Sequence, residues 1–145
     1  MPIAINGSGT VTGISVGGLP DGIVDADMLA ANAVTTAKLA TDSKQGLAKA
    51  WINFDGRFSD GIRDSCNVSS LTDEGTGHYT ITLTAAMANT NYAVVSSGHY
   101  ITTESGNVRE VGANTLATGS YKLNVTYNGS DKQDAASIYS AVFGD

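Results

Sequence analysis

All ten aromatic residues of this chain fall between Trp51 and Phe143, and the first fifty positions contain none. Aromatic side chains supply much of the buried area of a small domain. A long segment without them has little material for a core of its own. This feature alone divides the chain into an N-terminal segment at residues 1–49 and a foldable domain at residues 50–145.

Aliphatic residues in the first segment follow a five-residue spacing, at Leu29, Val34 and Leu39. In an α-helix each residue turns the chain by about 100°, so five steps place successive side chains on different faces. The spacing therefore does not predict one long amphipathic helix. The alanine content and the available N-cap residues still allow short helices at 25–40 and 44–50.

The apolar side chains of residues 1–49 are too few to offset the conformational entropy lost in ordering the whole segment. We therefore expect it to gain order by sharing buried surface with other chains. The turn sequence Gly17-Gly18-Leu19-Pro20-Asp21-Gly22 interrupts it. The residues predicted to join copies or to dock on a larger particle are Leu19, Leu29, Val34 and Leu39.

From residue 50 the apolar residues alternate with polar ones, which is typical of half-buried strands. In 78–84, for example, Tyr79, Ile81 and Leu83 share one face and threonines occupy the other. About seven short strands are predicted, at 51–54, 66–71, 78–84, 91–96, 107–111, 121–127 and 137–143. The predicted fold is all-β, a C-terminal antiparallel β-sandwich preceded by an extended segment with short helical pieces.

The alternation also predicts the core. We expect Tyr121, Leu123, Val125 and Tyr127 to point inward from one strand, and Trp51 to close one end of the core. A large ring that seals a core should be costly to remove, at roughly 3–5 kcal/mol if it is buried. Cys66 is expected to be a small half-buried strand residue.

Charge excludes several partners. Fourteen acids against eight bases give a net charge of −6, whereas nucleic-acid binding depends on neutralising phosphates with Lys and Arg. Neither nucleic acid nor an anionic membrane surface is an expected partner. No apolar run approaches the roughly 20 residues of a membrane span, and the first residues lack a signal-peptide pattern. The single cysteine excludes an internal disulfide and a cysteine-based zinc site.

Catalytic chemistry has weak support. His78 and His99 sit in matching Gly-His-Tyr triplets. If the chain formed a trimer, one histidine per chain on the axis would present three imidazoles to a metal. A hydrogen-bonded or solvated histidine is the simpler interpretation. Asp55 with Asp73 or Glu74 is a candidate for the two carboxylates of a glycosidase, although the sequence gives no distance between them. We predict a protein without cofactor or metal that is not an enzyme.

Two blocks of sequence resemble bacteriophage tail fibres. Residues 13–22 with 29–40 are similar to shaft and virion-proximal repeats, and residues 50–56, 67–81 and 91–95 are similar to a β-rich module near the C-terminal ends of such fibres. The resemblance implies a homotrimer, assembled in the host cytoplasm and located in the virion. It also implies that the first segment binds other tail or capsid proteins and that the β domain faces the bacterial surface.

Loops on a rigid scaffold carry recognition, so loops around 55–64, 96–106 and 128–135 are the predicted contacts with a host glycan or protein. Arg57 and Tyr100 are the predicted binding residues, because Arg and aromatic side chains are enriched at binding hot spots. Three alternatives stay open: a head fibre or a capsid or tail decoration protein, a polysaccharide depolymerase, and a lectin-like module outside any phage. The short length of the chain suits the first of them as well as it suits a short tail fibre.

Overall fold

The computed structural model describes residues 31, 33–35, 38–39, 46–58, 61–100 and 108–144. The chain divides into two units, Met1–Leu39 and Ala40–Asp145, and each is considered by itself. In the first unit Val34 is exposed and Leu39 is half-buried. The Lys38 backbone N–H donates to the Thr35 carbonyl at 2.9 Å, which closes a single turn. Leu19, Leu29 and most of the predicted helix at 25–40 lie outside the described residues.

The second unit is built from strands, and every pairing between them is antiparallel. The strands are β1 (Ala50–Phe54), β2 (Ile62–Cys66), β3 (Val68–Gly75), β4 (His78–Leu83), β5 (Ala93–His99), β6 (Val108–Ala117), β7 (Ser120–Tyr127), β8 (Asp131–Lys132) and β9 (Ser137–Phe143). The all-β prediction is confirmed. Each of the seven predicted strands has a counterpart, although β3 begins and ends two to four residues later than expected.

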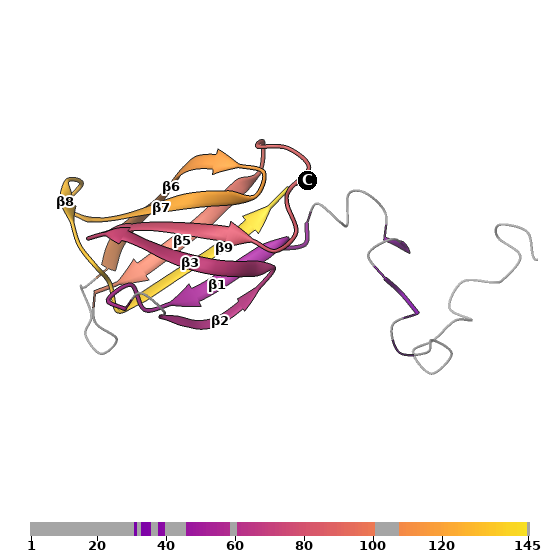
Figure 1. Ribbon diagram of the computed structural model, residues 1–145, viewed down its shortest axis with the longest axis horizontal. Coiled ribbons are helices and arrows are strands. Elements are labelled where there is room, and N and C mark those ends of the chain that lie inside the picture. The colour runs from indigo at the N-terminus through magenta and orange to yellow at the C-terminus, as the bar shows by residue number, and fades with distance from the viewer. Residues whose placement is uncertain are drawn as a thin grey trace, which may run out of the picture. The chain divides into compact units, whose positions relative to one another are not determined.

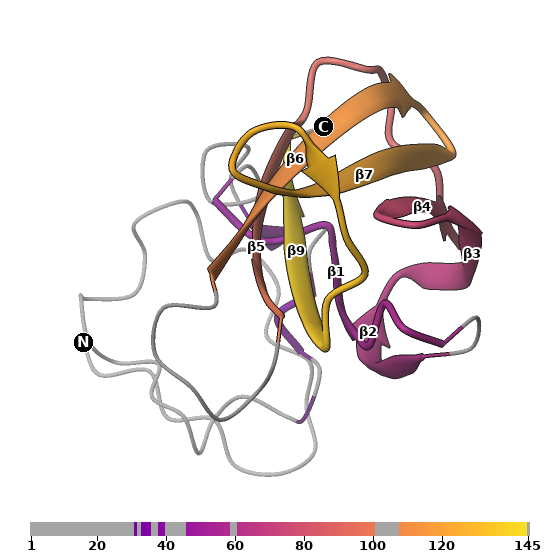
Figure 2. The ribbon, with the colours of Figure 1, turned by 90° about the vertical axis from the view of Figure 1, so that its left-hand side faces the viewer.

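The strands form one sheet in the order β2-β1-β9-β5-β6-β7-β4-β3, with β8 added beside β7. Figure 1 shows β9 between β1 and β5, and Figure 2 shows the strands curving round a common interior. The join between β5 and β6 consists of two residue pairs, Gly98 with Arg109 and His99 with Val108. The order begins at β2 and ends at β3, and the curvature leaves the sheet nearly closed.

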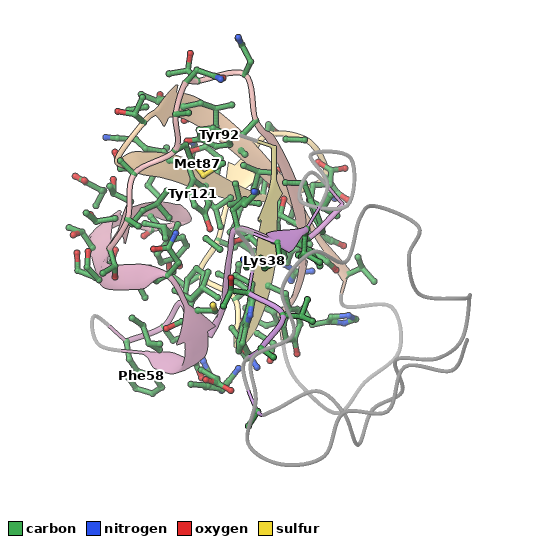
Figure 3. All side chains as sticks on the ribbon, turned by 90° about the vertical axis from the view of Figure 1, so that its right-hand side faces the viewer. Lys38, Phe58, Met87, Tyr92 and Tyr121 are labelled. Carbon is green, nitrogen blue, oxygen red and sulfur yellow. The ribbon has the colours of Figure 1, made fainter. Side chains whose placement is uncertain are left out.

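Alternating side chains fill the interior. On β4, Tyr79, Ile81 and Leu83 are buried, as the sequence pattern predicts. The other core residues include Ala50, Ile52, Phe54, Met87, Tyr92, Tyr121, Leu123, Val125, Ile138 and Val142. In Figure 3 the labelled Met87 and Tyr121 lie among the strands, whereas Phe58 lies at the edge.

Contacts across the core hold the two sides of the sheet together. The rings of Phe54 on β1 and Tyr79 on β4 meet edge to face, with centroids 5.1 Å apart. The hydroxyl of Tyr121 lies 2.7 Å from Oγ of Ser140 and forms a buried hydrogen bond with it. Burial raises the pKa of Tyr121 to about 12, so the hydroxyl keeps its proton at any physiological pH.

Several expectations are wrong. Trp51 does not seal the core: strand alternation turns Ala50 and Ile52 inward, and Trp51 faces outward with 36% of its surface exposed. Tyr127 is also exposed, because it lies at the end of β7 beyond the core. Cys66 is exposed at the end of β2.

The predicted helix at 44–50 is wrong in its described half, since 46–49 form a turn and bends and Ala50 begins β1. β2 begins in the predicted loop 55–64 and runs on to Cys66, β8 lies within the predicted loop 128–135, and β5 extends to His99. The short charged strands β2 and β8 carry no apolar alternation that could have predicted them.

Candidate functional site

A pocket of about 270 Å³ brings together both residues that the sequence predicts to bind a partner. Its lining residues are Arg57, Thr76, Tyr100, Lys132, Gln133 and Asp134. They come from four places in the chain: the turn after β1, the β3–β4 turn, the residue after β5, and the end of β8 with the connection that follows it. We call this site the polar pocket.

Asp55 fixes the Arg57 side of the polar pocket. Arg57 donates from Nε to Oδ1 at 2.9 Å and from Nη2 to Oδ2 at 2.7 Å. Arg63 donates from Nη2 to the same Oδ2 at 3.0 Å and to the Ala136 carbonyl at 2.6 Å. These hydrogen bonds, those of Arg57 above all, lower the pKa of Asp55 against the opposing effect of burial. The carboxylate is therefore charged and fully occupied with two guanidinium groups.

Asp134 fixes the opposite side of the pocket. Its Oδ1 accepts from the Gly77 backbone N–H at 2.8 Å and lies 2.7 Å from the hydroxyl of Tyr79. The same hydroxyl lies 2.8 Å from the Gly56 carbonyl, so its one proton is shared between two acceptors. Burial and the neighbouring carboxylates raise the pKa of Tyr79 far above its ordinary value. The phenol is therefore a permanent donor that ties the pocket to the core.

Two glycines make this close approach possible. Gly77 has a φ of +69°, and a Cβ there would meet the Val125 carbonyl oxygen. Gly56 lies against the hydroxyl of Tyr79 and Cδ1 of Ile138, where a Cβ has no space. Gly77 is required by its left-handed backbone and by the lack of space, and Gly56 by the lack of space alone.

Beside the pocket lies an arrangement that the sequence did not predict. The guanidinium carbon of Arg109 is 4.6 Å from the ring centroid of Tyr100 and 4.5 Å from that of Tyr127. Arg109 is only 6% exposed, and its Nε donates to Oε1 of Gln133 at 2.9 Å. Cation–π contacts of this kind are worth about 0.5–2 kcal/mol each.

We call Tyr100, Arg109 and Tyr127 the arginine–tyrosine stack. Both tyrosine rings remain about two-fifths exposed, so the stack presents aromatic surface to solvent at the rim of the polar pocket. No sequence signal links these three positions, because the pairing of β6 with β5 and β7 brings them together.

A second feature lies on the outer side of β1, β9 and β5. The strand register places Cys66, Trp51, Ala141 and Val95 in one row across β2, β1, β9 and β5. The next row contains Asp64, Asn53, Tyr139 and Ser97. A groove of about 420 Å³ follows these rows, and we call this surface the outer face.

The outer face exposes large apolar side chains, with Val95 63% exposed and Tyr139 42% exposed. Oδ1 of Asn53 is buried there and has no hydrogen-bond partner among the described residues. A strand face of this kind resembles a surface that another element covers.

The remaining catalytic and metal candidates stay apart. Glu74 is occupied, since its Oε1 accepts from the Thr80 hydroxyl at 2.8 Å and lies 3.9 Å from Nζ of Lys122. Nδ1 of His78 lies 3.5 Å from Nζ of Lys132, and His99 is half-buried on β5. The described part of the chain holds no group of three His, Cys, Asp or Glu side chains suited to a metal.

The part of the chain that the structure describes contains no helix long and apolar enough to cross a membrane. Comparisons with protein-family models, with curated proteins and with solved structures find no match for this chain.

Proposed function

We propose that this chain is a homotrimeric structural protein of a phage virion, a short tail fibre whose β domain contacts the host cell surface. One observation carries the host-contact part: Arg57 and Tyr100 line a single pocket, next to the exposed rings of the arginine–tyrosine stack. Exposed aromatic and arginine side chains around a pocket are typical of recognition sites. The shape of the domain in this proposal is a two-layer sandwich, which the narrow join between β5 and β6 supports.

The outer face supports assembly into a trimer. The row of Trp51, Ala141 and Val95 carries no charge, and the interior of an interface between copies is depleted of charged residues. Copies packed through this face would cover the exposed apolar side chains and could supply a donor to Asn53. The residues proposed to join the N-terminal segments of the copies remain Leu19, Leu29, Val34 and Leu39.

Two measurements test this function. Light scattering on the full chain should give the mass of a trimer, and a folded monomer would contradict the assembly. Gold-labelled antibody against the chain should bind virions at the tail, and labelled full chain should bind host cells. Absence of label from purified virions would reject the virion function altogether.

A head fibre or decoration protein is the second candidate, and the outer face also supports it. An uncharged groove of about 420 Å³ would suit a capsid or tail protein as well as a second copy of the chain. Antibody label on heads, with no binding of the free chain to host cells, would favour this candidate.

A polysaccharide depolymerase finds less support. The general acid of a glycosidase needs a raised pKa, whereas Arg57 lowers the pKa of Asp55. An assay for new reducing ends after incubation with host polysaccharide tests this directly. Their appearance with the purified chain would restore the depolymerase.

A further inference from the structure

We propose that the polar pocket binds a carboxylated sugar, with the carboxylate held by Lys132 and Arg57 and the sugar ring packed on Tyr100. This inference rests on the proposed function, since it names the class of ligand that the host-contact site would take.

Charge separates this end of the domain from the rest of the chain. The protein carries a net charge of −6 with eight basic residues. Arg57 and Lys132 line the polar pocket, Arg109 contacts its lining residues Tyr100 and Gln133, and Arg63 shares Asp55 with Arg57. A cluster of cations on an acidic protein creates a local field that attracts an anion.

The two carboxylates of the site, Asp55 and Asp134, cancel part of this field but are outnumbered by the four basic side chains. Asp55 is hydrogen-bonded to both Arg57 and Arg63, and Oδ1 of Asp134 is engaged with Gly77 and Tyr79. Asp131 precedes Lys132 on β8 and does not line the pocket. The local charge therefore favours an anionic ligand.

Among the described residues, the pocket keeps several donors without a partner, alongside Oδ2 of Asp134, which is an acceptor. Arg57 uses Nε and Nη2 on Asp55, which leaves Nη1 for a ligand. Gln133 uses Oε1 to accept from Arg109, which leaves its amide N–H groups. Lys132 brings three N–H donors, and only the long contact with His78 engages it among the described residues. A donor-rich pocket matches a ligand with many acceptors, such as a carboxylate flanked by hydroxyl groups.

Tyr100 supplies the apolar part of the site. The residue is 42% exposed, and the Arg109 guanidinium over its ring limits the directions in which the ring can turn. One face of a sugar ring carries mainly C–H groups and packs on an aromatic surface, while its hydroxyl groups remain free for polar partners. The combination of an aromatic ring with donors distinguishes a sugar from a simple inorganic anion.

The size and rigidity of the site suit one sugar unit. Its volume of about 270 Å³ is below the roughly 300–1,000 Å³ of pockets for drug-sized ligands. Arg57 and Asp134 are already held by hydrogen bonds to Asp55 and Tyr79. A site ordered before binding loses less conformational entropy when the ligand arrives.

The test is calorimetric titration of the full chain with short oligosaccharides of galacturonate, glucuronate and a sialic acid. The matched controls are the methyl esters of the same oligosaccharides, which keep the rings and remove the charge. We expect at least one acid form to bind at least tenfold more tightly than its ester, and its affinity to fall as salt is added. Inorganic phosphate alone is a separate probe for a general anion site.

The variants locate the binding. Lys132→Ala and Tyr100→Ala should each weaken binding about tenfold or more, whereas Lys122→Ala, which removes an exposed lysine outside the pocket, should not. Equal binding of acid and ester, equal binding of phosphate, no effect of Lys132→Ala, or no binding of any acid oligosaccharide would each overturn the proposal.

Failure of this inference can be told from failure of the proposed function. If labelled chain binds host cells and acidic oligosaccharides do not compete, the host-contact function stands and the sugar class is wrong. If the oligosaccharides bind but antibody finds no chain in virions, the site stands and the virion function is wrong.

Discussion

Asp55 lies buried between two guanidinium groups, and hydrogen bonds from Arg57 lower its pKa below the usual 3.8. A lowered pKa in the folded state stabilises the protein above pH 3.8, and this stabilisation is lost as the pH falls through the lowered value. Asp55→Asn should therefore reduce the unfolding free energy by about 1–3 kcal/mol near neutral pH. It should also flatten the loss of stability on acidification.

Urea unfolding of Asp55→Asn and of the parent across a series of pH values measures both effects. Asp131→Asn, at an exposed position on β8, is the control and should leave the curve unchanged. If Asp55→Asn loses stability on acidification as steeply as the parent, that loss does not come from Asp55.

The hydroxyl of Tyr79 provides a second test at the residue scale. Tyr79→Phe removes the hydroxyl donor that Asp134 and the Gly56 carbonyl share. The buried Gly56 carbonyl then lacks this hydrogen bond. We expect a loss of about 1–3 kcal/mol in unfolding free energy. Thermal unfolding measures this loss, with Tyr139→Phe on the exposed face of β9 as the control. A loss no larger than that of Tyr139→Phe would show that the shared proton contributes little.

Arg57 and Tyr100 could be selected from the sequence as recognition-prone types in expected loops. The structure places both at the polar pocket, and their role in binding stays a prediction. Arg109 could not be selected in this way, because its position depends on strand pairing between distant parts of the chain. Trp51 was misplaced because size suggested burial, whereas the alternation of β1 turns Ile52 and Phe54 inward.

At the scale of elements, Asn67 joins the two end strands of the sheet. It separates β2 from β3 with a φ of +56°. Its Nδ2 donates to the carbonyls of Lys49 and Ala85 at 3.0 and 3.1 Å, and its Oδ1 accepts from the Ala85 N–H at 2.7 Å. Asn67→Ala should cost about 2–4 kcal/mol, because it loses these bonds and places a Cβ in the left-handed region.

Asn67→Gly loses the same hydrogen bonds but tolerates the backbone angle. It should therefore be more stable than Asn67→Ala by about 1 kcal/mol in urea unfolding. Substitutions at surface sites usually change the unfolding free energy by no more than ~0.5 kcal/mol. If both variants stay within that range of the parent, the connection between β2 and β3 does not depend on Asn67.

Elements were predictable where apolar alternation is strong. The patterns of β4 and β7 predict both the strands and most of their buried faces. The strands β2 and β8 escaped prediction because their stability comes from hydrogen bonding to β1 and β7 and not from a buried face of their own. The nearly closed path of the sheet depends on long-range pairing such as β1 with β9, which no local pattern shows.

At the scale of the whole molecule, the outer face predicts how copies associate. Val95→Glu places a charge at a position that is 63% exposed in the single chain and buried in the proposed trimer. Burying an unpaired charge is costly, so the mass measured by light scattering should fall below that of a trimer while the thermal midpoint of the domain stays close to that of the parent.

Thr72→Glu adds the same charge at an exposed position on β3, away from the outer face, and should leave the mass unchanged. A Val95→Glu protein that keeps the mass of the parent would show that the copies associate without this face.

The outward position of Trp51 has a practical consequence, because it is the only tryptophan of the chain. Indole fluorescence therefore reports the environment of the row it shares with Ala141 and Val95. Its emission should shift to shorter wavelength on concentrating the protein and respond weakly to a ligand at Tyr100. One intrinsic chromophore thus distinguishes the proposed joining of subunits from ligand binding at the polar pocket, without any added label.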